Sequence, residues 1–129
     1  MLEQLDTIRM AQSMSAHAGQ RARLAAGNVA NADTPGYLSR DLTPFSETYR
    51  NAAANPMRAT RAGHLTTWGG GATDARTVQE RSGLSPNGNS VSLEDEMVRT
   101  ADIRRQHGIS LAVYRSSLNL LRGALGRRG

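Results

Sequence analysis

Apolar residues recur every three or four positions over the first thirty residues of the chain. They are Leu2, Leu5, Ile8, Ala11, Met14, Ala18, Ala22, Ala25 and Val29. This spacing places all of them on one stripe of an α-helix. The pattern therefore predicts a helix from Leu2 to about Asn31, with Gly19 and Gly27 as its weakest positions.

A second helical pattern fills the last third of the chain. Ser92 is well suited to cap the start of a helix, and the acidic residues 94 to 96 follow it where the helix dipole favours negative charge. A heptad seam with alternating steps of four and three then runs through Leu93, Met97, Thr100, Arg104, His107, Leu111, Tyr114, Leu118, Leu121 and Leu125. Such spacing is typical of paired helices, and Arg104 and His107 weaken its apolar character.

Both predicted helices are long for a globular domain. At about 1.5 Å per residue, each would measure roughly 45 to 50 Å. Only 38% of the residues are hydrophobic and five are aromatic, so a large compact core is not expected. Because long amphipathic helices without a core need partners, we expect both termini to be largely disordered in the free monomer and to fold on assembly.

The middle of the chain, residues 38–91, follows neither period. Gly69 to Gly71 and Pro86 to Gly88 are typical of loops, while Leu65 to Trp68 and Thr77 to Val78 fit short strands. The sequence therefore predicts a mainly α fold with three segments, 1–37, 38–91 and 92–129. Two long terminal helices pair as a coiled-coil-like hairpin, and the irregular middle region contains little or some β structure.

A strong stop signal separates the first helix from the middle region. Residues 28–37 read Asn-Val-Ala-Asn-Ala-Asp-Thr-Pro-Gly-Tyr. Pro35 followed by Gly36 suits a type II turn, because glycine takes a positive φ at no steric cost. Asn28 and Asn31 lie three residues apart on one side of the last helical turn, so their amides are placed to bond exposed carbonyls or a neighbouring chain.

Composition excludes several classes of protein. The chain has no cysteine, so it has no disulfide and no thiolate metal site, which fits either a reducing or an oxidising compartment. It has no run of 18 apolar residues and no secretory signal pattern at its N-terminus. The formal net charge is +5, and all 16 basic residues are arginine. Because only Arg104-Arg105 and Arg127-Arg128 form tight basic pairs, scattered charge is favoured over a nucleic-acid-binding patch.

No catalytic, cofactor-binding or metal-binding residue is predicted. The histidines His17, His64 and His107 lie on three different segments without a second ligand at metal-binding spacing, so we expect structural or solvent-exposed side chains. The carboxylates at 94 to 96 are consecutive, so they point in different directions around the helix and make a weak acid–base candidate. The glycines at 69 to 71 are not followed by Lys-Ser or Lys-Thr, as a phosphate-binding loop requires.

The run from Asn28 to Tyr37 resembles the signature of the bacterial flagellar basal-body rod protein family, Asn-x-Ala-Asn-x-x-Thr-Pro-Gly-Tyr. Every fixed position is present: Asn28, Ala30, Asn31, Thr34, Pro35, Gly36 and Tyr37. Within that family, the short length, Arg40-Asp41 and Phe45 after the turn, and residues 88–91 before the acidic helix start are similar to the FlgB family of proximal-rod proteins. Residues 61–65 are also similar to a weaker mid-chain motif, so the resemblance covers both ends well and the middle poorly.

The resemblance implies a structural subunit and no enzyme. Such a protein is exported by the flagellar type III apparatus without a cleavable signal peptide and assembles in the periplasm into the axial structure that transmits motor torque. The implied partners are the rod proteins FlgC, FlgF and FlgG, the rod-base adaptor FliE, the export apparatus and copies of the chain itself, with no nucleic acid, membrane insertion or cofactor.

We expect the turn motif to set the angle at which the chain leaves the first helix, with Tyr37 packing on its own or an adjacent subunit. The expected assembly interface consists of Leu5, Ile8, Met14, Leu111, Tyr114, Leu118, Leu121 and Leu125.

Several alternatives remain at this point. The related short rod protein FlgC shares the turn motif and the helical ends. The arginine content permits a basic nucleic-acid-binding protein, although no base-reading motif is present. The leucine-rich end of the second helix also fits a membrane-binding face, but heptad spacing favours a helix partner. A peptidoglycan-cleaving enzyme is the least favoured, because no pair of carboxylates stands in a plausible cleft.

Overall fold

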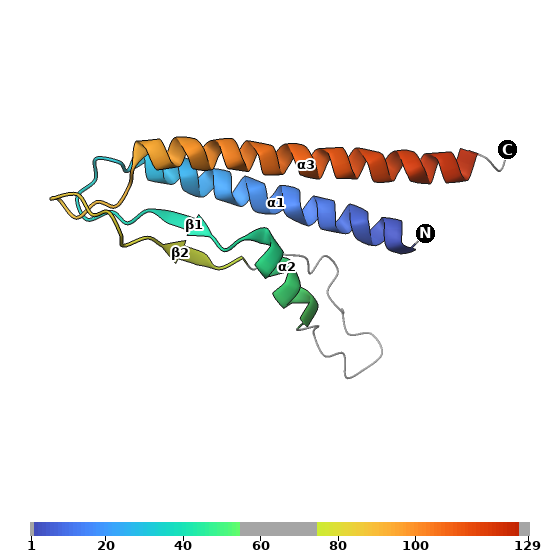
Figure 1. Ribbon diagram of the computed structural model, residues 1–129, viewed down its shortest axis with the longest axis horizontal. Helices are drawn as coiled ribbons and strands as arrows, with labels where there is room; N and C mark the ends of the chain where they lie inside the picture. The colour runs from blue at the N-terminus through green and yellow to red at the C-terminus, as the bar shows by residue number, and fades with distance from the viewer. Residues whose placement is uncertain (1, 55–74, 127–129) are drawn as a thin grey trace.

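Two long helices form an antiparallel hairpin that runs the length of the molecule. The computed structural model describes residues 2–54 and 75–126. Along the chain the elements are α1 (Leu2–Ala30), β1 (Arg40–Leu42), α2 (Phe45–Ala54), β2 (Thr77–Gln79) and α3 (Leu93–Gly126). Helices α1 and α3 lie side by side, and the start of α1 and the end of α3 lie at the same end of the hairpin (Figure 1). The predicted mainly α fold with two long terminal helices is therefore confirmed.

The start of α3 follows the predicted signal. Ser92 precedes the helix, and its Oγ accepts a hydrogen bond from the backbone N–H of Asp95 at 3.3 Å. The carbonyl of Ser92 accepts the first helical bond from the N–H of Glu96 at 3.0 Å. This geometry is that of an N-cap residue, so the side chain satisfies one of the free N–H groups at the start of the helix.

The two long helices pair through small side chains. The residues at the centre of this contact are, on α1, Ala11, Ala18 and Ala25, and on α3, Ile103, Ser110 and Ser117, each at most 6% exposed. The three alanines repeat every seven residues, so they form a single line down the inner side of α1. Side chains of this size let two helix backbones approach closely and fill little volume.

The predicted heptad seam is not the stripe of α3 that faces α1. The buried residues of α3 are Glu96, Ile103, Gln106, Ser110 and Ser117, each one position before a residue of the predicted seam. One residue corresponds to about 100° of rotation around a helix, so the seam lies on a flank of α3. Its first two members, Leu93 and Met97, are 55% and 74% exposed. The prediction was wrong because serine and glutamine, which read as polar, fill the contact.

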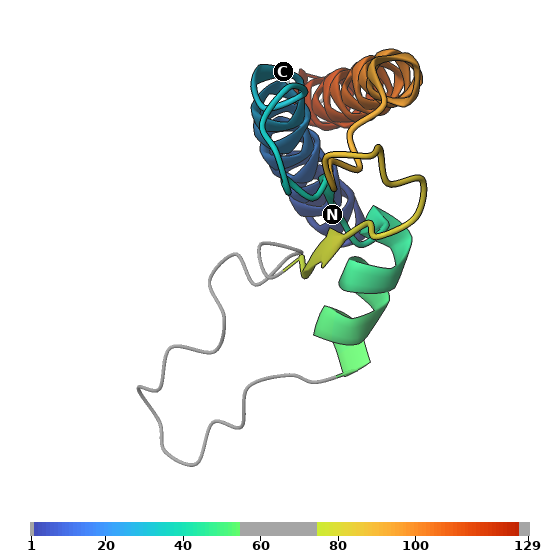
Figure 2. The same ribbon diagram turned by 90° about the vertical axis from the view of Figure 1, so that its left-hand side faces the viewer.

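A small β-layer lies along α1. Strands β1 and β2 are antiparallel, with Arg40 opposite Gln79 and Leu42 opposite Thr77. This ribbon runs beside the hairpin, and α2 projects away from it (Figures 1 and 2). The strand predicted at Thr77 to Val78 is confirmed, whereas β1 and α2 were not predicted. The strand predicted at residues 65–68 and the glycines at 69–71 lie outside the described residues.

Candidate functional site: the turn motif, the polar cluster and the helix flanks

The turn after α1 has the predicted geometry. The backbone N–H of Tyr37 donates to the carbonyl of Thr34 at 3.3 Å, which closes a four-residue turn around Pro35 and Gly36. Gly36 has φ 72°, the value that a type II turn requires at its third position. The Tyr37 hydroxyl returns to α1 and donates to Asn28 Oδ1 at 3.4 Å. Tyr37 thus packs against its own helix.

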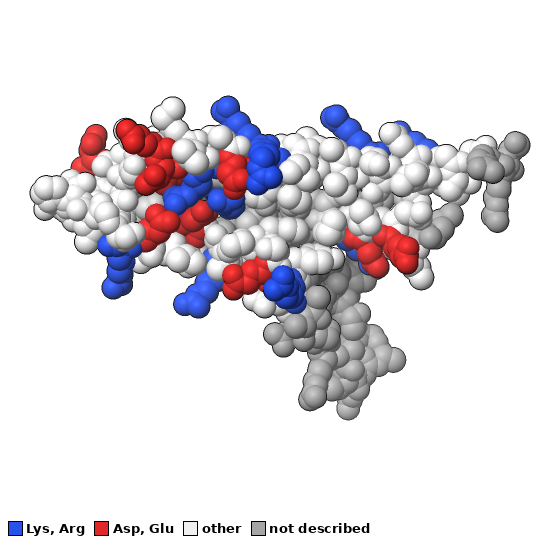
Figure 3. Space-filling view, viewed as in Figure 1, with Lys and Arg blue, Asp and Glu red and all other residues white. Residues whose placement is uncertain are grey.

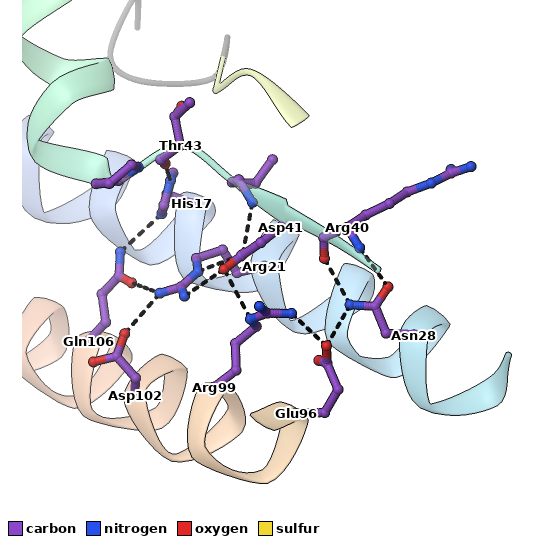
Figure 4. A network of polar contacts seen from close by, with 12 residues as sticks. His17, Arg21, Asn28, Arg40, Asp41, Thr43, Glu96, Arg99, Asp102 and Gln106 are labelled. Carbon is purple, nitrogen blue, oxygen red and sulfur yellow. Dashed lines mark hydrogen bonds and ion pairs between the residues drawn. The ribbon is translucent and has the colours of Figure 1, made fainter. Parts of the chain in front are cut away.

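Asn28 joins the end of α1 to the start of β1. Its side chain is 0% exposed. The amide Nδ2 donates to the carbonyl of Arg40 at 2.8 Å, and Oδ1 accepts from the N–H of the same residue at 3.0 Å (Figure 4). This reciprocal pair resembles the bonds that a neighbouring strand would make. A buried amide therefore satisfies both backbone groups of one residue of the middle segment.

Asn31 and Asn89 bond backbone carbonyls at the end of α1 and in the turn after it. Asn31 Nδ2 donates to the carbonyl of Gly27 at 2.8 Å. This bond agrees with the prediction that the Asn31 amide binds an exposed carbonyl of the last helical turn. Asn89, on the loop before α3, donates to the carbonyls of Asn31, Ala32 and Thr34 at 2.8 to 2.9 Å. It is 2% exposed. Asn31 thus bonds a carbonyl in the last turn of α1, and Asn89 bonds three carbonyls of the turn that follows Ala30.

A polar cluster ties β1 to both long helices. Its members are Arg21 and Asn28 on α1, Ser39 and Asp41 at β1, and Glu96 and Arg99 on α3. All of them except Ser39 are labelled in Figure 4. Arg21 donates two parallel hydrogen bonds of 3.0 Å to the carboxylate of Asp41. Arg99 Nε lies 3.2 Å from Oδ2 of the same carboxylate. This bidentate geometry is the strongest arrangement of an arginine and a carboxylate.

The carboxylate of Asp41 is held in the charged form. Burial alone would raise the pKa of Asp41, but hydrogen bonds from Arg21 and from the N–H of Leu42, with the charge of Arg99, outweigh it and lower the pKa. Glu96 is 1% exposed. Its Oε1 accepts from Asn28, Ser39 and Arg99, whereas its Oε2 has no partner among the described residues. The cluster consequently places four charged groups of alternating sign between the helices and the ribbon.

His17 and His107, the histidines in the described part of the chain, have different surroundings. His17 is buried between α1, α3 and the residues after β1, whereas His107 is exposed and contacts Ser15 at 3.3 Å. His64 lies outside the described residues. Over residues 2–54 and 75–126, no group of three His, Cys, Asp or Glu side chains is placed to hold a metal ion.

The residues expected at the assembly interface lie in one half of the hairpin. We call residues 2–14 and 109–126, which carry the two chain ends, the open half, and residues 17–28 and 96–106 the closed half (Figure 1). On α1, Leu5 is exposed, while Ile8 and Met14 are half-buried. On α3, Leu111 and Leu125 are exposed, and Tyr114, Leu118 and Leu121 are half-buried. The hairpin itself therefore covers only part of each of these side chains.

Charged side chains of both signs are intermixed on the face of the molecule shown in Figure 3, mainly on its left half. Arg21 forms ion pairs with Asp41 and Asp102. Arg99 forms ion pairs with Asp41, Glu80 and Glu96. This arrangement agrees with scattered charge, which the sequence favoured over a basic patch. Among the helices of the described residues, none is long and apolar enough to cross a membrane.

The sequence did not identify most of the polar cluster. The sequence pattern included Asp41 only in the family resemblance, did not single out Arg99, and placed Glu96 among three acidic residues that face the helix dipole. Glu96 is instead buried and bonds to Asn28, which is 68 positions away in the chain. A signal was available, because an acid and an arginine three residues apart on a helix, Glu96 and Arg99, form a typical ion pair.

Curated proteins similar to the chain share one name, although a scan against models of known protein families finds no match. The flagellar basal body rod protein FlgB of Agrobacterium fabrum is 30% identical over 104 residues, covering 74% of this chain and 75% of that protein. FlgB of Cereibacter sphaeroides is 29% identical over 105 residues, covering 81% and 82%. FlgB of Salmonella typhimurium is 29% identical over 142 aligned positions, covering 95% and 99%.

These similarities extend far beyond the ten-residue turn motif, because the alignment with the Salmonella protein takes in nearly all of both chains. The relatives carry the name that the residues after the turn and before α3 had suggested. On the identity and coverage of the Agrobacterium protein, the chain belongs to the family of flagellar basal body rod proteins FlgB.

Proposed function

We propose that the chain is a non-enzymatic structural subunit of the proximal rod in the basal body of the bacterial flagellum. It assembles through α1 and α3 into the axial structure and helps to transmit motor torque. Its partners in this proposal are copies of itself, the rod proteins FlgC, FlgF and FlgG, and the adaptor FliE. It reaches the periplasmic rod through the flagellar type III export apparatus. The names of the relatives, all FlgB rod proteins, support this choice over FlgC.

One observation carries the proposal: the hairpin leaves large apolar side chains exposed in its open half. Leu2, Leu5, Leu120 and Leu125 are 79%, 42%, 62% and 63% exposed, respectively. The small residues between α1 and α3 already complete the contact within the chain, so these leucines are available to neighbours. An open helical assembly requires two different surfaces on each subunit, and exposed apolar flanks on both helices can provide them.

Deletion of the gene tests the function directly. Basal bodies purified from the deletion strain should contain rings without a rod, and the cells should not swim. Restoring the gene on a plasmid should restore both rod and motility. Intact rods in the deletion strain would refute the proposal.

Charge substitutions on the exposed flank test the assembly surface. Leu118→Asp and Leu125→Asp should abolish incorporation into the rod, because assembly would bury an unpaired carboxylate at a cost of several kcal/mol. Leu125 is 63% exposed, so its substitution should leave the free chain folded. The measurement is swimming in soft agar together with the amount of each variant in purified basal bodies.

Asn119→Asp is the matched control, since it puts the same charge on an exposed polar position of the same helix. This variant should swim normally. Normal swimming with Leu125→Asp would show that the open half of α3 is not an assembly surface. Equal loss of motility in the control would mean that charge anywhere on α3 is harmful.

A further inference from the structure

His17 is a buried imidazole that contacts three elements at once. It lies on α1 and is 1% exposed. Its Nε2 is 2.8 Å from the carbonyl of Thr43, between β1 and α2, and its Nδ1 is 3.0 Å from Nε2 of Gln106 on α3 (Figure 4). The ring of Phe45, at the start of α2, meets it edge-on with 5.7 Å between the centroids. No step of the proposed function uses this side chain.

The hydrogen bonds around His17 determine where its proton lies. Arg21 can only donate, and its Nη1 donates to Oε1 of Gln106 at 3.2 Å. The NH2 group of Gln106 must therefore face His17, so Nδ1 of the imidazole accepts. The carbonyl of Thr43 can only accept, so Nε2 carries the hydrogen. The site thus fits one form of His17, the neutral imidazole with its proton on Nε2.

A second proton on His17 would disrupt this chain of bonds. The new Nδ1–H would point at the NH2 of Gln106, and rotating that amide would turn its NH2 toward Arg21, which also only donates. Burial lowers the pKa of His17, as does the charge of Arg21, while the bond to Thr43 and the charge of Asp41 offset this in part.

The neighbouring carboxylates offer no alternative partner to an imidazolium. On β1, Asp41 is engaged by Arg21 and Arg99. On α3, Asp102 receives bonds from Arg105 and Arg21, which lower its pKa. The contact that α2 makes with His17 is the apolar ring of Phe45.

We propose that His17 is a pH-sensitive latch for the middle segment. The neutral imidazole holds the junction of β1 and α2 on the helix pair, and protonation in mildly acidic solution releases that junction. The α1–α3 pair stays together, because its line of alanine and serine residues and the Arg21–Asp102 bond do not depend on His17.

The direction of the pH dependence follows from linkage. A histidine whose pKa is lower in the folded state contributes its full stabilisation above its unfolded pKa of about 6.5 and loses it as the pH falls below that value. The pKa of Asp41 is lowered from an already acidic value, so its bonds to both arginines persist through this window. The latch therefore opens while the carboxylate of Asp41 remains charged.

Nuclear magnetic resonance on the full-length, ¹⁵N-labelled chain tests the latch. At pH 7.5, long-range ¹H–¹⁵N spectra should show His17 neutral with its proton on Nε2. Between pH 7.5 and 5.0, amide protection of residues 40–48, corrected for intrinsic exchange, should fall at least about tenfold. Protection near Ala18 and Ile103 should change less than about twofold.

Three variants separate the latch from general acid sensitivity. His17→Gln keeps a donor for Thr43 and an acceptor for Gln106, so the pH dependence of residues 40–48 should disappear. Gln106→Glu can accept from both Arg21 and an imidazolium, so the midpoint of release should move down by at least about one pH unit. His107→Gln, at an exposed histidine, is the matched control and should behave as the parent chain.

The proposal has defined failures. A charged His17, or a proton on Nδ1 alone, at pH 7.5 would overturn it. So would protection of residues 40–48 that does not change with pH, or the same pH profile in Gln106→Glu as in the parent chain. Gln106→Glu retains His17 itself, so it decides the question even where His17→Gln fails to fold.

Discussion

Single amide side chains hold the turn motif together from within the chain. Asn28 pairs with both backbone groups of Arg40, and Asn89 bonds three carbonyls in the turn after α1. Each would be expensive to replace, because a buried backbone group that loses its partner costs about 1–3 kcal/mol. The asparagines of the motif therefore have a structural reason to be present, independent of any neighbouring subunit.

Gly36 gives the most specific prediction at this scale. Gly36→Val should destabilise the chain by at least about 1–2 kcal/mol, because a β-branched residue rarely adopts a positive φ. A Cβ at this position would meet nothing within 4 Å, so the cost is conformational and not a clash. The altered exit from α1 should then block rod assembly more than export. Thermal unfolding and the ratio of rod-incorporated to secreted protein measure the two effects.

Gly36→Asn is the matched control, since asparagine tolerates the left-handed region best after glycine. It should unfold close to the parent chain and support swimming. If valine is tolerated as well as asparagine, the positive φ of residue 36 has no role in assembly.

At the residue scale, the sequence predicted local chemistry and missed distant contacts. The Pro35–Gly36 turn and the Ser92 cap depend on neighbours in the sequence, so they could be predicted. The burial of Asn28 depends on Arg40 and Glu96, which lie 12 and 68 positions away. Nothing in a linear pattern pairs these residues, so the polar cluster required the structure.

At the scale of elements, the pairing of α1 with α3 depends on small residues. Leucine at a buried alanine position would force the two backbones apart or strain neighbouring rotamers. Periodicity predicted both helices because each repeats apolar residues over many turns. Periodicity assigned the wrong face of α3 to the contact with α1, because leucine contributes more than serine to any hydrophobic pattern. It missed β1 and α2 because three and ten residues carry too few repeats.

Ala18→Leu tests this pairing. Ala18 is 1% exposed and opposes Ile103, so the added volume should lower the free energy of unfolding by about 1–3 kcal/mol. Ala16→Leu, at an exposed position on the same helix, is the matched control and should change stability by less than about 0.5 kcal/mol. Urea unfolding followed by circular dichroism measures both. If Ala18→Leu is as stable as the parent chain, α1 and α3 can move apart without a loss in the free energy of unfolding.

At the scale of the whole molecule, the hairpin has two unequal halves. The closed half contains His17 and the helix residues of the polar cluster, and β1 is bound there to both helices through Asp41 (Figure 4). In the open half, the contact between α1 and α3 consists mainly of small residues such as Ala11 and Ser117, and the leucines lie outside it. A short alanine and serine contact buries little apolar area, so it provides little stabilisation. We therefore expect disorder in the free monomer only in the open half of the hairpin, and no longer over the whole of both terminal helices.

Amide hydrogen exchange on the free chain and on assembled rods would measure this difference. In the free chain, residues 17–28 and 96–106 should be protected, whereas residues 2–14 and 109–126 should exchange at least about a hundredfold faster, because local opening there exposes few buried groups. In rods the open half should become protected, since neighbouring subunits would cover its leucines. Arg21→Gln should weaken protection of the closed half selectively, because it removes the bonds to Asp41 and Asp102. Uniform protection along both helices of the free chain would contradict folding of the open half on assembly and would mean that the small-residue contact is sufficient by itself.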